Sequence, residues 1–185
     1  MAFHRDRTRL EKPANRFLAV PIGLLAMAMT LPVFAQWRQE ASYRVPATQF
    51  FNGLPIAGQW QDAEKAGFTY CVNLKVTMRC RRGGLMLMGH GPFSGAVDLD
   101  GGDGRGGFHQ LTLWHDRDQD APIDVAQDLE RQGWQSCRTM QHGWGDQHIF
   151  RQRGSTLRIS IDVSYYGKRR IRVMPEWQGP PPACL

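Results

Sequence analysis

Cationic side chains gather in segment 151–172, where Asp162 is the only acidic residue. If this segment alternates as a strand, Arg158 faces away from the apolar side, with Arg170 and Arg172 beside it across a hairpin. A cationic sheet face attracts phosphate, carboxylate, lipopolysaccharide or an acidic protein. The alternative is a solvated outer face neutralised by Asp162 and other acids, which is the commoner role of charged runs. The candidate binding residues are Arg151, Arg153, Arg158, Arg170 and Arg172.

Aspartates at 116, 118, 120 and 124 have the spacing of ligands in a calcium-binding loop. Two diagnostic positions differ, because Ala121 stands where such loops have glycine and Gln127 where they have a bidentate glutamate. The alternative is a polar connector that places acids at the positive end of the following helix, and this interpretation is favoured. The candidate calcium ligands are Asp116, Asp118 and Asp120.

Met86, Met88 and His90 are two residues apart, so they share one face if this segment is extended. Thioether and imidazole ligands suit Cu(I), which makes these three residues the candidate copper ligands. The alternative is an apolar strand in which methionine fills irregular gaps in the core. Core packing is the favoured interpretation, since methionine is far commoner there than in copper sites.

His109 and His115 are six residues apart and share a strand face, and His115 is next to Asp116. The chain contains no Gly-x-Ser-x-Gly or His-Glu-x-x-His motif and no nucleophile with an evident local base. We therefore assign no catalytic residue and favour binding over catalysis, with a small secreted hydrolase as an alternative.

Two eleven-residue segments resemble each other and organise the expected elements. Residues 61–71 read QDAEKAGFTYC and residues 127–137 read QDLERQGWQSC. Self-similarity of this kind predicts one supersecondary unit built twice. In each unit we expect one helix, at about 59–66 in the first and between Asp120 and Gly133 in the second, followed by antiparallel strands.

The predicted fold class is α+β, with two tandem helix-plus-antiparallel-meander units that are each two layers deep and stabilised by disulfides. The units span 36–118 and 119–185. Periodicity leaves open whether they join into one sheet or form two. The expected strands are 68–74, 76–82, 85–88, 96–100 and 108–115 in the first unit, with Gly83-Gly84 as a turn, and 134–140, 148–153, 156–165 and 169–174 in the second.

The first 35 residues have the pattern of a secretory signal peptide. Five basic residues precede an apolar stretch from Phe17 to Met29, and Ala35 supplies the small residue before the cleavage point. The alternative is an uncleaved membrane anchor. Removing the five basic and two acidic residues of this segment lowers the formal net charge from +6 to +3.

An even number of cysteines in an exported chain predicts disulfides. Cys71, Cys80, Cys137 and Cys184 allow three pairings, and we favour Cys71–Cys80 with Cys137–Cys184. The sequence thus predicts a bacterial periplasmic or secreted binding protein, without a cofactor or a membrane span after signal cleavage. Its expected partner is an anionic envelope component or an acidic protein, and not a nucleic acid. The alternatives are a periplasmic copper or calcium protein and the hydrolase named above.

Overall fold

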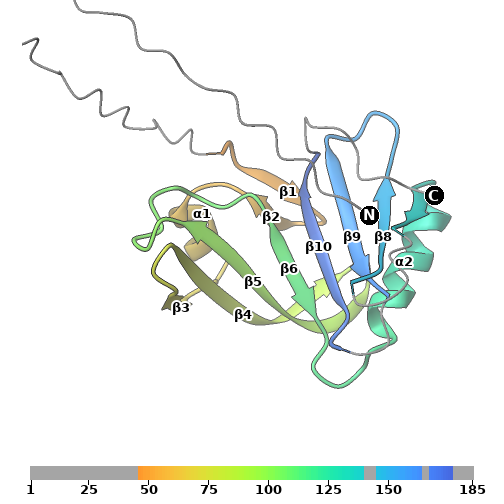
Figure 1. The fold of residues 1–185 in the computed structure, drawn as a ribbon, viewed down its shortest axis with the longest axis horizontal. Coiled ribbons are helices and arrows are strands. Elements are labelled where there is room, and N and C mark those ends of the chain that lie inside the picture. The colour runs from red at the N-terminus through yellow and green to blue at the C-terminus, as the bar shows by residue number, and fades with distance from the viewer. Residues whose placement is uncertain (1–45, 140–144, 164–166, 177–185) are drawn as a thin grey trace, which may run out of the picture. The chain divides into compact units, whose positions relative to one another are not determined.

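Ten strands and two helices make up the described part of the chain, residues 46–139, 145–163 and 167–176, in this computed structural model (Figure 1). Strands account for 49% of these residues and helices for 14%. The helices are α1 (Trp60–Lys65) and α2 (Ala121–Arg131), and a small hairpin joins β1 (Gln49–Phe51) to β2 (Leu54–Ala57). The other strands are β3 (Tyr70–Asn73), β4 (Thr77–Leu87), β5 (His90–Asp100), β6 (Leu111–Trp114), β7 (Gln135–Arg138), β8 (Gln147–Arg151), β9 (Leu157–Asp162) and β10 (Arg170–Pro175).

These eight strands form one antiparallel sheet in the order β3-β4-β5-β6-β10-β9-β8-β7. The central pair is β6 with β10, where Leu113 lies opposite Ile171 and Leu111 opposite Val173. The predicted fold class is therefore wrong. The chain is mostly β, and a single continuous sheet replaces the expected pair of tandem two-layer α+β units. The two similar eleven-residue segments lie at opposite edges of this one sheet and do not mark separate layered units.

The core lies on one face of the sheet. A row of directly opposed apolar residues crosses β4, β5, β6, β10 and β9, and each is fully buried: Cys80, Val97, Leu111, Val173 and Ile159. Helix α2 adds Val125, Ala126 and Leu129 to this cluster, and β2 adds Ile56. Because side chains alternate along a strand, the polar neighbours of the core residues all point to the opposite face. That face is called the open face below.

The helix positions predicted from sequence are confirmed. Gly67 and Gly133 follow the two helices with φ of 83° and 82°, a left-handed conformation that ends a helix and suits glycine. At the start of α2, Asp118 Oδ1 accepts hydrogen bonds from the backbone N–H groups of Asp120 and Ala121. These contacts fix the connector between β6 and α2.

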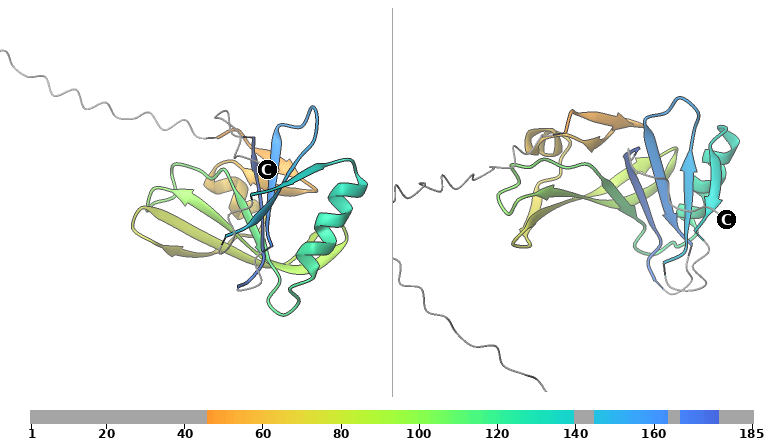
Figure 2. Two further views of the ribbon diagram at one scale, coloured as in Figure 1. Left: turned by 45° about the vertical axis from the view of Figure 1, so that its right-hand side comes forward. Right: turned by 45° about the horizontal axis from the view of Figure 1, so that its top comes forward.

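The Gly83-Gly84 turn expected from sequence is wrong, because β4 runs through it as one strand from Thr77 to Leu87. The pairing register shifts between Arg82 and Leu85, as in a β-bulge. The chain reverses only at the next turn, between Leu87 and His90. This turn reaches α2, where His90 Nε2 lies 2.7 Å from Asp128 Oδ2. Figure 2 shows α2 packed beside the strands from two further directions.

A disulfide joins Cys71 to Cys80, as predicted. The two residues are directly opposite each other on β3 and β4, so the bridge holds the edge strand to its neighbour. Cys184 of the other predicted bridge and the predicted signal peptide, residues 1–35, lie outside the described residues. Within the described ranges, no helix is long and apolar enough to cross a membrane.

Candidate binding groove on the open face

A second transverse row crosses the open face of the sheet. Each residue lies directly opposite the next on the neighbouring strand, so all of them point to the same side. The row runs Tyr70, Arg81, Ala96, Thr112, Arg172, Ser160 and Ile149, from β3 to β8. Its middle positions have small side chains between long ones, which leaves a hollow over β5 and β6.

This hollow is an open groove with a volume of about 620 Å³. Ala96 lies on its floor and is 3% exposed. Because Ala96 presents only a methyl group between Arg81 and Thr112, the depth of the groove depends on this residue. The lining residues come from β3, β4, β5, β6, β10 and the adjoining loops: Tyr70, Arg79, Arg81, Arg82, Gly83, Ser94, Gly95, Ala96, Asp98, Gln110, Thr112, Trp114, Asp116, Lys168, Arg170 and Arg172.

The groove lining carries six cationic and two acidic side chains. Two of the arginines are held in two-point ion pairs. Arg79 contacts Asp98 at 2.6 and 2.8 Å, and these hydrogen bonds raise the pKa of the guanidinium. Arg172 contacts Asp162 at 2.6 and 3.1 Å. Such planar pairs fix both side chains along the sheet surface.

Arg81 and Arg170 differ from these arginines, because neither guanidinium group makes a hydrogen bond or ion pair with any described residue. Both are exposed. Arg81 lies on β4 and Arg170 on β10, with β5 and β6 between them. Three strand spacings across the sheet, about 14 Å, and an offset of two residues along β10 from Arg172, about 7 Å, separate their backbones by about 16 Å. The groove therefore has an uncompensated guanidinium on each side of its floor.

Asp116 closes one end of the groove with a network of three donors. Its carboxylate accepts hydrogen bonds from Lys168 Nζ and Ser94 Oγ, at 2.8 and 2.7 Å, and from Trp114 Nε1 at 3.1 Å. The bond from Lys168, followed by that from Ser94, lowers the pKa of Asp116 to about 2. This carboxylate links β5, β6 and the segment before β10.

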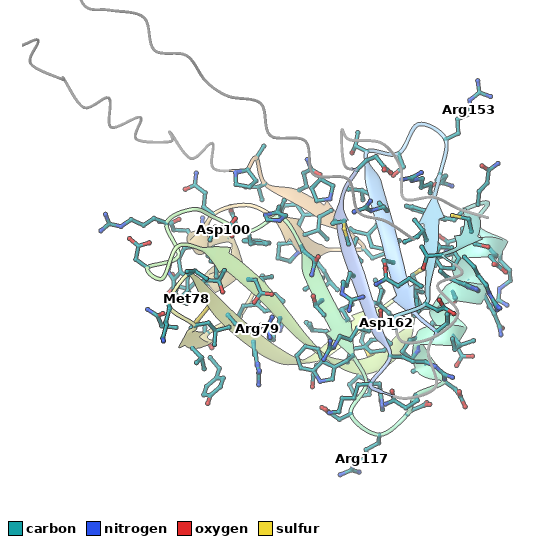
Figure 3. All side chains as sticks on the ribbon, in the orientation of Figure 1. Met78, Arg79, Asp100, Arg117, Arg153 and Asp162 are labelled. Carbon is teal, nitrogen blue, oxygen red and sulfur yellow. A yellow bond between two sulfur atoms is a disulfide. The ribbon has the colours of Figure 1, made fainter. Side chains whose placement is uncertain are left out.

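Of the five arginines predicted from sequence, Arg170 and Arg172 line the groove. Arg153 lies in the hairpin between β8 and β9 and points away from the sheet (Figure 3). Arg151 and Arg158 are directly opposite each other further along the open face. Arg151 Nη2 contacts Glu176 at 3.1 Å, and Arg158 Nη2 lies 3.1 Å from the sulfur of Met174.

Sequence reasoning missed Arg79 and Arg81 as groove residues. Their alternation in TMRCRR was a usable signal, because Cys80 between them is buried. Both arginines lie within the expected strand 76–82, but the sequence does not show that this strand joins the same sheet as Arg170 and Arg172.

The candidate copper residues lie around the turn between β4 and β5 and not along one extended segment. Met86 is an exposed residue of β4, Met88 is in the turn with φ of 54°, and His90 contacts Asp128. Met88 packs against the core. The three side chains therefore have different surroundings.

The candidate calcium residues have different partners. Asp116 contacts Lys168, Asp118 accepts backbone hydrogen bonds at the start of α2, and Asp120 Oδ1 lies 3.0 Å from Arg169 Nη1. Within the described ranges, no three histidine, cysteine or acidic side chains are grouped as metal ligands would be.

The two histidines considered for catalysis serve local structure. His115 Nδ1 accepts the backbone N–H of Asp118 at 2.7 Å, and its ring packs edge-on against Phe93. His109 is exposed, and its Nδ1 lies 3.5 Å from Asp100. Neither histidine lines the groove, and Asp116 is hydrogen-bonded to Ser94, Trp114 and Lys168 instead of to either of them.

Comparisons with known proteins return no relative. No protein-family model, curated protein or solved structure matches the chain.

Proposed function

We propose that this protein is an exported binding protein whose open-face groove takes up an anionic partner through Arg81 and Arg170. The observation that carries the proposal is the pair of uncompensated, exposed guanidinium groups on the two sides of a hollow. The other lining cations already have partners, because Arg79, Arg172 and Lys168 face carboxylates and Arg82 donates to the carbonyl of Ala66.

Charge and shape both support an anionic partner. Fixed ion pairs stiffen the face around the groove, so that little side-chain conformational entropy is lost there on binding. The excess of cationic over acidic side chains in the lining gives a positive potential that concentrates anions at this surface. Arg81 and Arg170 then supply charged donors suited to carboxylate or phosphate oxygens.

The spacing of these two arginines favours an extended partner over a single small ion. Their backbones are about 16 Å apart on a diagonal, so a partner that contacts both guanidinium groups must cross β5 and β6. It would then lie over Ala96 and Thr112 on the groove floor.

Two features support export. The N-terminal segment has the composition of a signal peptide. The Cys71–Cys80 disulfide is a type of bond that persists in oxidising compartments such as the periplasm or the exterior of the cell.

The first experiment measures binding of poly-L-glutamate to the purified protein at low and moderate salt. We expect Arg81→Gln with Arg170→Gln to weaken binding by about tenfold or more, because two charged contacts are lost. The matched control is Arg117→Gln with Arg153→Gln, which removes the same charge from two exposed residues outside the groove lining (Figure 3). Equal losses in both variants would show that binding follows net charge alone and would overturn the proposal.

A second variant tests the groove without changing charge. Ala96→Leu places a larger side chain on the groove floor and leaves both arginines in place. We expect weaker poly-L-glutamate binding with little change in the melting temperature. Unchanged binding in this variant would show that the anion does not enter the groove.

A further inference from the structure

An apolar stripe follows the outer edge of the sheet beside the groove. Six large apolar side chains are exposed among the described residues, and four of them belong to β3 and its following turn. Tyr70 is 67% exposed, Val72 41%, Leu74 45% and Val76 77%. A cluster of this kind at one position, in contrast to scattered single residues, is typical of an interaction site.

The backbone of β3 is also open on its outer side. No described strand pairs with β3 except β4. Leu74 N donates to Thr77 O, which makes these two residues a hydrogen-bonded pair of the hairpin. Pairs alternate along antiparallel strands, so the backbone N–H and C=O groups of Cys71 and Asn73 point away from β4. An extended segment of another chain can pair with these groups.

The stripe is continuous with the groove. Tyr70 lines the groove and lies directly opposite Arg81, and Val72 lies opposite Arg79 on the same face. A strand added outside β3 would have its backbone two strand spacings, about 10 Å, from that of Arg81. An acidic side chain on the open-face side of the added strand can then contact the guanidinium of Arg81, because the two side chains together span this distance.

We infer that the partner is a protein whose extended segment adds to the edge of β3, with apolar side chains on Tyr70 and Val72 and acidic side chains directed at Arg81. This inference rests on the proposed function and narrows it, since it selects a protein over a polysaccharide, a lipid headgroup or a free anion. The added strand runs along β3 and reaches Arg81, while another part of the same protein crosses the groove floor to Arg170. Strand addition draws affinity from backbone hydrogen bonds and specificity from alternate side chains.

Charge argues against a second copy of this chain as the occupant. Lys75, Arg81 and Arg82 surround the edge and are exposed. Two copies joined through β3 in a symmetric dimer would place the cations of both copies around the same interface. Like charges across an interface oppose association, whereas an acidic segment complements them.

The test compares two labelled peptides of equal charge. The first is Thr-Val-Thr-Glu-Thr-Val-Thr-Glu, which places valine and glutamate on one face of a strand. The second has serine at both valine positions. We expect the valine peptide to bind at least about fivefold more tightly, because only it can bury apolar surface on Tyr70 and Val72.

Val72→Lys separates edge docking from simple charge attraction, since the two predict opposite changes in the affinity for an acidic peptide. The variant adds a positive charge, so charge attraction alone would tighten binding of an acidic peptide. Docking on the edge predicts several-fold weaker binding of the valine peptide. Met86→Lys is the matched control, because it adds the same charge at another exposed apolar residue, one outside the groove lining.

The outcomes separate this inference from the proposed function. Equal affinity for the two peptides, or tighter binding by Val72→Lys, overturns the inference, while poly-L-glutamate binding that depends on Arg81 and Arg170 still supports the proposed function. If neither the peptides nor poly-L-glutamate binds, both fail. A dimer in sedimentation experiments that Val72→Lys dissociates would overturn the inference in favour of a second copy.

Discussion

Arg172 and Asp162 lie on adjacent strands and meet through two contacts, Nη1 to Oδ1 at 2.6 Å and Nη2 to Oδ2 at 3.1 Å. Their side chains are only 21% and 14% exposed. The pair neutralises the arginine nearest the middle of the open face, so the groove charge available to a partner depends on which arginines face a carboxylate on a neighbouring strand, whether directly opposite, as Asp98 is to Arg79, or diagonal, as Asp162 is to Arg172.

Asp162→Asn leaves Arg172 without its counter-charge. We expect the free energy of unfolding to fall by about 1–3 kcal/mol, because a mostly buried charged hydrogen-bond partner is lost. Affinity for poly-L-glutamate should rise a few-fold, since a third guanidinium becomes available. Urea unfolding and a binding titration measure the two effects. Asp103→Asn is the control, because its ion pair with Arg105 is exposed and worth little. Weaker anion binding in Asp162→Asn would contradict this role.

Asp116 makes the stability of the protein depend on pH in the acidic range. Its pKa is lowered to about 2 in the folded state by Lys168 and Ser94, from an ordinary value of 3.8. A lowered pKa stabilises the fold above pH 3.8, and that contribution is lost as pH falls towards 2. Melting temperatures of the wild type and Asp116→Asn should therefore differ at pH 6 and converge between about pH 4 and 2. A constant difference across this range would contradict the assignment.

Gly95 and Ala96 are adjacent in β5 but point to opposite faces, so their substitutions should have separable effects. A Cβ on Gly95 would lie 2.4 Å from Leu85 Cδ1 and 2.9 Å from Leu113 Cδ2, both in the core. We expect Gly95→Ala to lower the free energy of unfolding by about 1–3 kcal/mol through overpacking. The folded fraction of Gly95→Ala should keep the affinity of the wild type for poly-L-glutamate, whereas Ala96→Leu should bind it more weakly. Chemical denaturation with a binding titration checks both.

Cys71→Ser with Cys80→Ser removes the bridge between β3 and β4. The sequence separation is nine residues, for which the loss of chain constraint corresponds to about 2.5 kcal/mol. Hydrogen exchange should show faster opening of β3 than of β6 or β10. Binding of the valine peptide should weaken more than binding of poly-L-glutamate, because the peptide depends on an ordered edge. Equal protection of β3 with and without the bridge would contradict this expectation.

Local patterns in the sequence were sufficient to predict the two helices and the Cys71–Cys80 bridge. Gly67 and Gly133 end helices through their own conformation, and the two cysteines are brought together by a short hairpin. The continuous sheet was beyond prediction because the pairing of Leu113 with Ile171 joins residues far apart in the chain. Periodicity reports which face of a strand is apolar, but it does not report which strand lies next to it.

The candidate site was only partly predictable for a related reason. The cationic character of the face around Arg170 and Arg172 followed from alternation, and both residues line the groove. Which arginines are neutralised depends on the carboxylates of the neighbouring strand, diagonal for Arg172 and Asp162 and directly opposite for Arg79 and Asp98. Arg81 gains its importance from the small side chain of Ala96 opposite it, a relation that only the strand register reveals.

The pairing of β6 with β10 also determines the order in which the fold can be completed. Strand β6 is synthesised well before its partner β10, which is the last strand of the described chain. Until β10 emerges, β6 and β9 each have one unpaired side, and the core row from Cys80 to Ile159 is interrupted between Leu111 and Ile159. Such long-range closure slows folding and exposes strand edges to aggregation. A chain that ends before Arg170 should therefore be recovered mainly in aggregates.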